Sequence, residues 1–296
     1  MTRTAVEAPG ALDIARLEEA ARRIRVEIIR AVHHAQGGHL GGPLSMADLV
    51  AALFFHAMRI RPDEPAWPGR DRFILSKGHA SIGLYSAMAL RGYFPVEELA
   101  TFDARGSRLQ GHPDMRLLPG IDMSTGSLGM GISAGVGIAL GAQLNGQDIR
   151  TWVLLGDGEC QEGQVWEAAM VAARYSLGNL IAIVDHNKLQ QYGWSAGGPD
   201  DRRPPAETGE LADRWRAFGW RVLETDGHAM ADIVATLAEA RNGGPRPTVV
   251  IAHTVKGRGV SFMEGQYRWH TQPVTADHLR QAMTELGEPV ASEPVT

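Results

Sequence analysis

The chain has 296 residues, an ordinary apolar content of 44% and a formal net charge of −5 at pH 7. Its basic residues are scattered and its apolar runs are short, so we expect neither a nucleic-acid-binding surface nor a membrane span. The single cysteine, Cys160, excludes an internal disulfide, and the polar N-terminus lacks the apolar core of a signal peptide, which together predict a cytoplasmic protein.

The first part of the chain is predicted to be mainly helical, with one short buried strand. Apolar residues recur at helical spacing from Ala11 to Ala35, and Ser45 is expected to begin the next helix as part of a capping box. The expected elements are helices over 11–35, 45–58 and 81–90, a loop over 61–69, a strand over 72–76 and an irregular stretch over 103–125. Loops as long as the last one are usually functional or disordered.

The rest of the chain alternates strands with helices. The expected elements are a helix over 126–144, a strand ending at Gly156, a helix from about Glu162, a strand ending at Asp185, a loop over 188–207, helices over 207–218, 229–241 and 276–286, and strands over 220–225 and 247–254. The strands are continuous apolar runs, which predicts an α/β fold with a mostly parallel sheet and helices on both faces. We expect one domain over 11–286, between a flexible lead (1–10) and a flexible tail (287–296).

Two polar side chains follow the apolar runs in the middle of the chain. Asp157 lies between two glycines after the first run, and Asn187 follows the second. Consecutive parallel strands joined by a helix end at the same edge of a sheet, so these side chains should lie close together. Their oxygens, beside a glycine turn and a helix N-terminus, suit Mg²⁺ or Ca²⁺ bound to a diphosphate. The simpler alternative is a turn that closes a strand, with Asn187 capping a loop.

The segment GDGECQEGQVWEAAM, followed by VDHNK, resembles the thiamine-diphosphate-binding motif, and its QEG and WEA resemble the transketolase family in particular. The resemblance implies the thiamine-diphosphate-binding fold of the diphosphate type. It implies that Asp157, Asn187 and the backbone carbonyl of Leu189 bind the metal ion. The cofactor-binding residues that it implies here are Gly158, whose backbone would meet the diphosphate, Glu159, Asn187 and Glu162, which matches a carboxylate buried near the subunit interface of the family.

Three histidines lie in glycine-rich contexts: His39 in GGHLGG, His79 in SKGHAS and His112 in QGHPD. Histidine transfers protons near neutral pH and binds hydroxyl groups, although histidines on surface loops are the simpler interpretation. These segments also resemble transketolase segments whose histidines line the channel to the reactive carbon. The resemblance makes all three candidate catalytic residues and His79 a cofactor contact. Leu40 replaces the proline that follows the first histidine in the family.

Two further segments contribute candidate residues. The glycines of TGSLGMG could wrap a ligand or only allow helices to pack, and the segment resembles one that contacts the aminopyrimidine in transketolases. That resemblance assigns Gly126, Ser127 and Leu128 to the cofactor. In HTVKGRGVSF, Lys256 and Arg258 could bind phosphate, but a solvated loop is the favoured interpretation. His270 receives no catalytic role, because the family pattern slips there.

The resemblance covers residues 15 to 275, whereas transketolases are more than twice as long and carry a second, pyrimidine-binding domain. We therefore expect the diphosphate-binding subunit of a split transketolase, active with a pyrimidine-binding partner in an α2β2 heterotetramer. The implied reaction transfers a two-carbon ketol unit from a ketose phosphate to an aldose phosphate. The alternatives are a deoxyxylulose-phosphate synthase-like protein, a 2-oxo acid dehydrogenase α subunit, or a non-enzymatic diphosphate-binding module.

Overall fold

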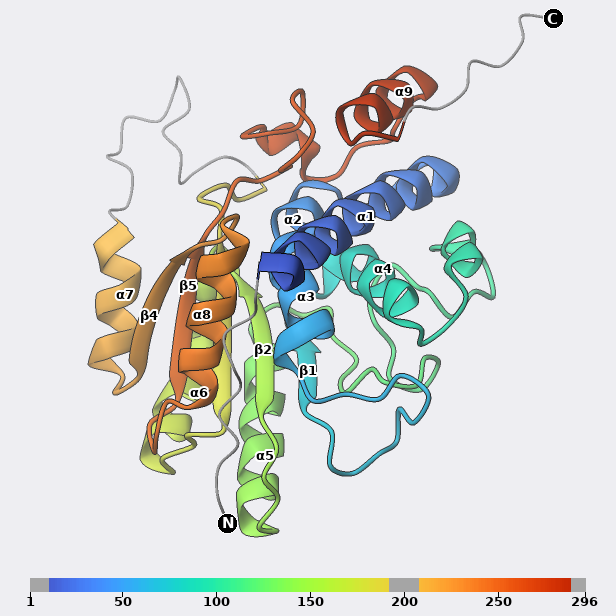
Figure 1. Cartoon of the computed structure of the whole chain (residues 1–296). Coiled ribbons are helices and arrows are strands. Elements are labelled where there is room, and N and C mark those ends of the chain that lie inside the picture. Colours follow the sequence, from blue (N-terminus) through green and yellow to red (C-terminus); the bar gives the residue numbers. More distant parts are fainter. Residues whose placement is uncertain (1–10, 192–207, 289–296) are drawn as a thin grey trace, which may run out of the picture.

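A parallel sheet lies at the centre of the computed structural model, which describes residues 11–191 and 208–288 (Figure 1). Its strands are β1 (Arg72–Leu75), β2 (Thr151–Gly156), β3 (Leu180–His186), β4 (Arg221–Asp226) and β5 (Thr248–His253). Their order in the sheet is β1-β2-β3-β5-β4, and each neighbouring pair is parallel. The predicted α/β class and the parallel sheet are confirmed.

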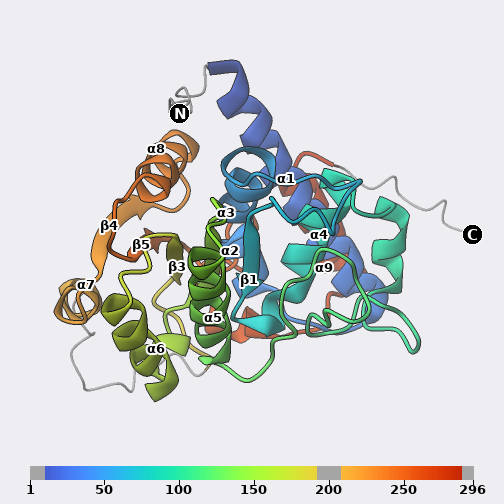
Figure 2. The same cartoon turned by 90° about the horizontal axis from the view of Figure 1, so that it is seen from below.

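Helices cover both faces of this sheet, as Figures 1 and 2 show from two directions. The helices are α1 (Ala11–Ala35), α2 (Gly41–Ser45), α3 (Ala47–Ala52), α4 (Ser81–Arg91), α5 (Met130–Leu144), α6 (Gly163–Arg174), α7 (Thr208–Ala217), α8 (Met230–Arg241) and α9 (Ala276–Glu285). Shorter helical turns are η1 (Leu53–Ala57), η2 (Gly78–Ala80), η3 (Val96–Thr101), η4 (Glu159–Gln161) and η6 (Tyr267–His270). One apolar cluster joins the sheet to α1, α3, α4 and α8, and a second joins it to α5, α6 and α7.

The strands are apolar throughout because alternate side chains enter these two clusters. In β2, Trp152 and Leu154 pack on the side of α1 and α8, whereas Val153 and Leu155 pack on the side of α5 and α6. All four side chains are fully buried. A sheet with two covered faces needs such strands, since successive side chains point to opposite faces.

The predicted capping box at Ser45 is wrong. The helical segment begins earlier, at Gly41, and the helix that follows Ser45 begins at Ala47 without a side-chain cap. The Ser45 hydroxyl instead donates to buried acceptors, the carbonyl of Gly42 at 3.0 Å and the carboxylate of Asp185 at 2.5 Å. The Ser45 hydroxyl therefore binds the buried carboxylate of Asp185 instead of capping the helix.

Other boundaries differ less. The glycine-rich helix begins at Met130 rather than at residue 126, because Gly129 has a left-handed φ of 82° and residues 126–129 form a loop. The irregular stretch over 103–125 contains no helix or strand, as expected. The predicted lead (1–10), most of the 188–207 loop and nearly all of the predicted tail lie outside the described residues.

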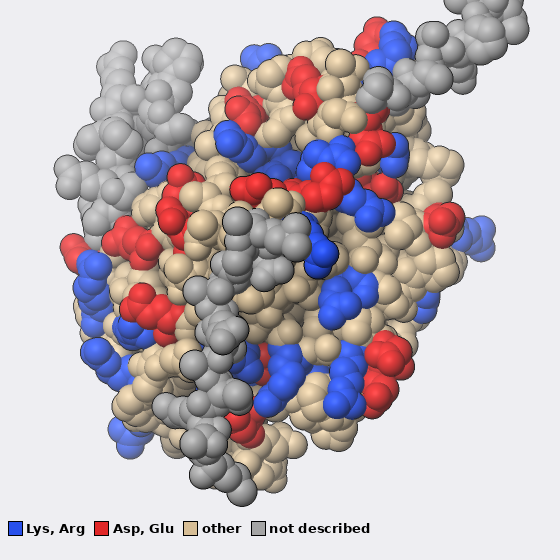
Figure 3. Space-filling model, viewed as in Figure 1, with Lys and Arg blue, Asp and Glu red and all other residues tan. Residues whose placement is uncertain are grey.

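The visible face of the molecule carries positive and negative side chains intermixed, with no single-sign stripe (Figure 3). Across residues 11–191 and 208–288, no helix combines the length and the apolar character that a bilayer crossing requires.

Candidate functional site

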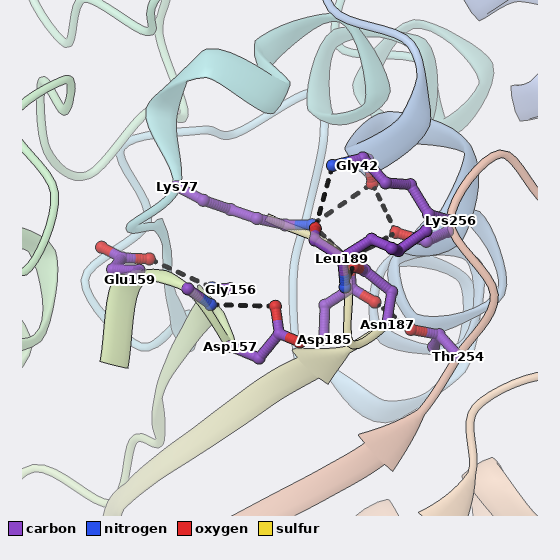
Figure 4. Close-up of polar contacts among 12 residues, drawn as sticks. Gly42, Lys77, Gly156, Asp157, Glu159, Asp185, Asn187, Leu189, Thr254 and Lys256 are labelled. Atoms are coloured by element: carbon purple, nitrogen blue, oxygen red, sulfur yellow. Dashed lines mark hydrogen bonds and ion pairs between the residues drawn. The ribbon is translucent and has the colours of Figure 1, made fainter. Parts of the chain in front are cut away.

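Asp157 and Asn187 lie side by side at the carboxyl ends of β2 and β3 (Figure 4). Gly156, the last residue of β2, pairs with Asp185 near the end of β3, so the chain leaves both strands at one edge of the sheet. One Asp157 carboxylate oxygen accepts a hydrogen bond of 2.6 Å from the backbone N–H of Lys188. The expected proximity of the two strand ends is therefore observed.

The chain after β3 turns so that a side-chain oxygen and a backbone oxygen reach the same place. Lys188 has a left-handed φ of 62°, and the Oδ1 of Asn187 accepts a hydrogen bond of 3.1 Å from the backbone N–H of Leu189. The carbonyl of Leu189 accepts a hydrogen bond of 3.0 Å from the Lys256 ammonium group. Asp157, Asn187 and Leu189 all line one cavity.

This cavity has a volume of about 480 Å³. The predicted site residues that line it are His39, His79, His112, Gly126, Leu128, Asp157, Gly158, Glu159, Asn187 and Leu189. Segments from the whole length of the chain thus meet at the carboxyl edge of the sheet, which is where α/β sheets bind ligands. Ser127 is exposed and does not belong to this lining.

Glu162, which the resemblance places near a subunit interface, is exposed in the single chain, and the buried carboxylate of the turn is Glu159. Glu162 immediately precedes α6, whereas η4 directs Glu159 inward. The Glu159 carboxylate accepts hydrogen bonds from Ser76 Oγ at 2.5 Å and from the backbone N–H groups of Gly129 at 2.8 Å and Gly156 at 3.1 Å. It therefore joins three segments that line the cavity, and burial raises its pKa.

Three imidazoles form a cluster in the cavity. The ring centroids of His39, His79 and His270 lie 4.9 to 5.2 Å apart. Burial lowers the pKa of His79 to about 2 and that of His270 to about 3, and it also lowers the pKa of His39. These rings are neutral at physiological pH, so each offers one hydrogen-bond donor and one acceptor. His112 is more exposed than these three, and it also lines a second hollow, to which His39 contributes as well.

Lys256 is buried, which corrects the favoured interpretation of a solvated loop; Arg258, two residues later, is exposed as that interpretation expected. The ammonium group of Lys256 lies 3.0 Å from His270 Nδ1. Burial lowers the pKa of Lys256 to about 8, whereas burial and the nearby Asp185 raise the pKa of Asp157 to about 6. The cavity therefore holds a cation and a carboxylate that both lack full solvation.

Lys77 and Asp185 belong to the surroundings of the site, although neither is singled out from the sequence. Their side chains form a buried ion pair, with 2.5 Å between Lys77 Nζ and Asp185 Oδ2. Burial alone would raise the pKa of Asp185, but the ammonium group and nearby hydroxyl groups hold it below its ordinary value. The available signal was an acidic residue inside the apolar run LIAIVDH, since a buried charge requires a partner. His270, which receives no role from the sequence, also lines the cavity.

Two neighbouring residues have structural roles. Cys160 is buried with a free thiol, and burial raises its pKa well above the ordinary value, so it packs in the core. His186 is the last residue of β3, and the centroid of its ring lies 5.4 Å from that of His253, outside the cavity lining.

The donor atoms of the site are hard oxygens. Among the residues that the structure describes, no three His, Cys, Asp or Glu side chains are grouped to hold a metal ion. The candidate set instead combines one carboxylate, one amide and one backbone carbonyl, which suits Mg²⁺ or Ca²⁺ with further oxygens from a ligand. Fold and site together define an α/β protein with a polar ligand cavity at the carboxyl edge of its sheet.

Comparison with known proteins identifies the family. The model of the family "Transketolase, thiamine diphosphate binding domain" matches residues 17–293. The 6-deoxy-6-sulfo-D-fructose transketolase subunit SqwG of Clostridium sp. (strain MSTE9) is 43% identical, covering 91% of this chain and 96% of that protein. An apulose-4-phosphate transketolase subunit of Phocaeicola vulgatus is 40% identical, covering 94% of this chain and 96% of that protein.

Solved structures agree with this result. The transketolase mutant R525L from Pichia stipitis superposes with a TM-score of 0.85 at 35% sequence identity, over 97% of this chain and 43% of that chain. The chain thus spans less than half of the length of this transketolase. It belongs to the transketolase family, in its thiamine diphosphate binding domain, and the predicted class of ketol-transferring enzyme is confirmed.

Proposed function

We propose that this chain is the diphosphate-binding subunit of a two-chain, cytoplasmic transketolase, with a pyrimidine-binding partner chain in an α2β2 assembly. The proposed reaction moves a two-carbon ketol unit from a ketose phosphate to an aldose phosphate. Two relatives that are named as transketolase subunits match this chain over 96% of their own length, which supports the division into two chains.

The observation that carries the proposal is the set of oxygen donors at the ends of β2 and β3. Asp157, Asn187 and the Leu189 carbonyl would hold Mg²⁺ or Ca²⁺, and their hard oxygens fit such an ion. Lys256 and the backbone of Gly158 would hold the diphosphate of thiamine diphosphate. Gly126 and Leu128, on the adjoining loop, would support the rest of the cofactor. When bound, the cofactor supplies the carbanion chemistry of the reaction.

The histidines would bind and orient the sugar. Because His39 and His79 are neutral, each ring can donate one hydrogen bond to a hydroxyl oxygen and accept one from a hydroxyl group. A neutral imidazole can also take up the proton of a substrate hydroxyl. His112 lies at the more exposed side of the cavity, where it would meet an incoming sugar.

The named relatives widen the choice of substrate to be tested. One is named for 6-deoxy-6-sulfo-D-fructose and the other for apulose-4-phosphate, both of which are ketoses with an anionic group. The donor substrates tested for this chain should therefore include a ketose phosphate and a sulfonated ketose.

Two experiments test the proposal. In the first, the melting temperature of the full-length chain is measured with Mg²⁺ and either thiamine diphosphate or ADP. Only thiamine diphosphate should raise the melting temperature. The reason is that a ligand that binds only the folded state stabilises that state. In the second, the chain and its partner are assayed with xylulose 5-phosphate, with a sulfonated ketose and with pyruvate. Equal stabilisation by ADP, or activity with pyruvate alone, would contradict the proposal.

A further inference from the structure

The fully buried Asp185 lies directly beneath the candidate cation site, two residues before Asn187 in the chain. It does not line the cavity. Its carboxylate is the centre of a hydrogen-bond network that joins four segments of the chain at the end of β3 (Figure 4).

The side chains that are hydrogen-bonded to this carboxylate all donate to it. Lys77 Nζ and Ser45 Oγ each lie 2.5 Å from Asp185 Oδ2, and the hydroxyl of Thr254 donates to Oδ1. Removing one partner of a buried ion pair is costly, so an ionised Asp185 in this place is a fixed feature of the fold. An ionised carboxylate can only accept hydrogen bonds, so it dictates that each adjacent group turns a donor toward it.

The amide group of Asn187 obeys this constraint. Its Nδ2 lies 3.3 Å from Asp185 Oδ2 and 3.4 Å from Ser45 Oγ. If the amide were reversed, its oxygen would face the carboxylate oxygen and two acceptors would repel each other. The nitrogen of Asn187 is therefore held inward, and Oδ1 is turned away from Asp185, where it accepts the N–H of Leu189.

We propose that Asp185 is a positioning residue for the divalent cation, because it fixes the Asn187 amide with its oxygen available to the metal ion. This inference rests on the proposed function, since it concerns the same cation. Ligand orientation by such outer groups is a general feature of metal sites, and its loss weakens metal affinity by about 10- to 100-fold.

Lys77 has a separate part in this arrangement. Its ammonium group donates to Asp185 and, at 3.2 Å, to the carbonyl of Gly42. It neutralises the buried carboxylate, so that the position of Asn187 is fixed without adding a net negative charge beneath the cation. Replacing Asp185 alone would leave this ammonium group unpaired beside the cation site.

The test measures, by calorimetry, the Mg²⁺ concentration that half-saturates thiamine diphosphate binding to the full-length chain assembled with its pyrimidine-binding partner. The variants are Asp185→Asn and Asp185→Asn with Lys77→Gln, the second of which removes the unpaired ammonium group. Both should need at least about tenfold more Mg²⁺ than the wild type, because an amide at position 185 can turn its NH₂ group toward Asn187 and no longer enforces the orientation of that side chain. Saturation at the wild-type Mg²⁺ concentration in either variant would overturn the inference.

Asp71→Asn is the matched control. Asp71 is also fully buried and ion-paired, with 2.6 Å to Arg241, but it immediately precedes β1 at the opposite end of the sheet. This variant should lower the melting temperature and leave the Mg²⁺ requirement unchanged. An equal increase in that requirement would show that general destabilisation is the cause and would overturn the inference.

Ser45→Ala keeps the test decisive if the Asp185 variants do not fold. It removes the second acceptor that faces Asn187 Nδ2 and keeps both charges of the ion pair. The loss of one ordinary hydrogen bond should raise the Mg²⁺ requirement about fivefold; no increase would overturn the inference. A wild-type assembly of the two chains without Mg²⁺-dependent cofactor binding would overturn the proposed function as well. Normal wild-type binding with unaffected variants would overturn only the role of Asp185.

Discussion

Asp157 and Lys188 join two neighbouring strand ends through one hydrogen bond of 2.6 Å, from the Lys188 backbone N–H to the Asp157 carboxylate. The bond depends on the left-handed backbone of Lys188, which turns the chain just after β3. Through this contact the candidate ligands on both strands keep a fixed spacing before any ligand binds. Preorganisation of this kind lowers the cost of binding.

The first prediction concerns Asp157→Asn, which should separate cofactor binding from stability. Mg²⁺-dependent binding of thiamine diphosphate should weaken by at least about 100-fold, because the only carboxylate of the candidate set is lost. The ligand-free chain should become more stable above pH 6. In the wild type, the pKa of Asp157 is raised to about 6 in the folded chain, against an ordinary value of 3.8. The ionised Asp157 carboxylate therefore opposes folding by roughly 3 kcal/mol.

The sign of this pH effect is specific. Below pH 3.8 the group is protonated in both folded and unfolded chains, so the variant gains nothing there. The advantage should grow between about pH 4 and 6 and then stay constant. Urea unfolding of both chains at pH 5 and pH 8 measures it, and a variant that gains no stability at pH 8 would contradict the buried charge.

The second prediction concerns the neutral state of His79. Its pKa of about 2 in the folded chain, against 6.5 when unfolded, means that the unfolded chain binds more protons below pH 6.5. Stability should therefore fall as the pH drops from 6.5, by at most about 1.4 kcal/mol per pH unit for this one group. His79→Asn should reduce that slope relative to the wild type.

The measurement is the free energy of unfolding in urea at pH 7, 6 and 5. His34→Asn is a suitable control for the substitution itself, because His34 is exposed on α1 and lies outside the cavity lining. Parallel curves for the wild type and His79→Asn would show that this imidazole is protonated in the folded chain.

The third prediction compares two glycines of α5. A side-chain carbon on Gly131 would lie 2.7 Å from the Cα of Ser76, whereas Gly137 is exposed with no atom within 4 Å. Gly131→Ala should therefore destabilise the chain by about 1–3 kcal/mol through overpacking. Gly137→Ala should stabilise it by up to about 1 kcal/mol, because alanine favours a helix.

Thermal or urea unfolding of the chain without its partner measures both changes. Gly131→Ala should also weaken thiamine diphosphate binding, since Ser76 donates to Glu159 in the cavity wall. Similar stabilities for the two variants would mean that α5 does not approach β1 as closely as the structure shows.

The fold was largely predictable because its signals are local and repeated. The apolar run before Gly156 and the helical spacing from Ala11 to Ala35 predicted elements whose bounds the structure reproduces closely. The parallel topology followed from strands that are apolar on both faces. Where the prediction failed, at Ser45, a local capping signal was overridden by Asp185, which is 140 residues away in the sequence.

The candidate site was predictable in part. Residues beside glycines, such as Asp157 and His79, can be recognised in the sequence, because glycine next to a polar side chain is a local signal of a ligand-binding turn. Lys77 and Asp185 did not, since each is an ordinary charged residue until the fold buries the two together. Lys256 is buried in the fold whereas Arg258 is exposed, and no local pattern in the sequence predicts this difference.

The last prediction uses that difference. Lys256→Met should weaken the binding of thiamine diphosphate by at least about tenfold, because a buried cation that faces the diphosphate is lost. Arg258→Met should leave affinity unchanged, since Arg258 is exposed and pairs with Glu264 at 3.5 Å.

The pKa of about 8 for Lys256 predicts that wild-type affinity falls as the pH rises above 8, when the ammonium group loses its proton. Lys256→Met should lack this alkaline loss. Calorimetric titrations at pH 7 and pH 9 measure both effects, and an equal loss of affinity in the two variants would show that general positive charge, rather than the buried ammonium group, attracts the cofactor.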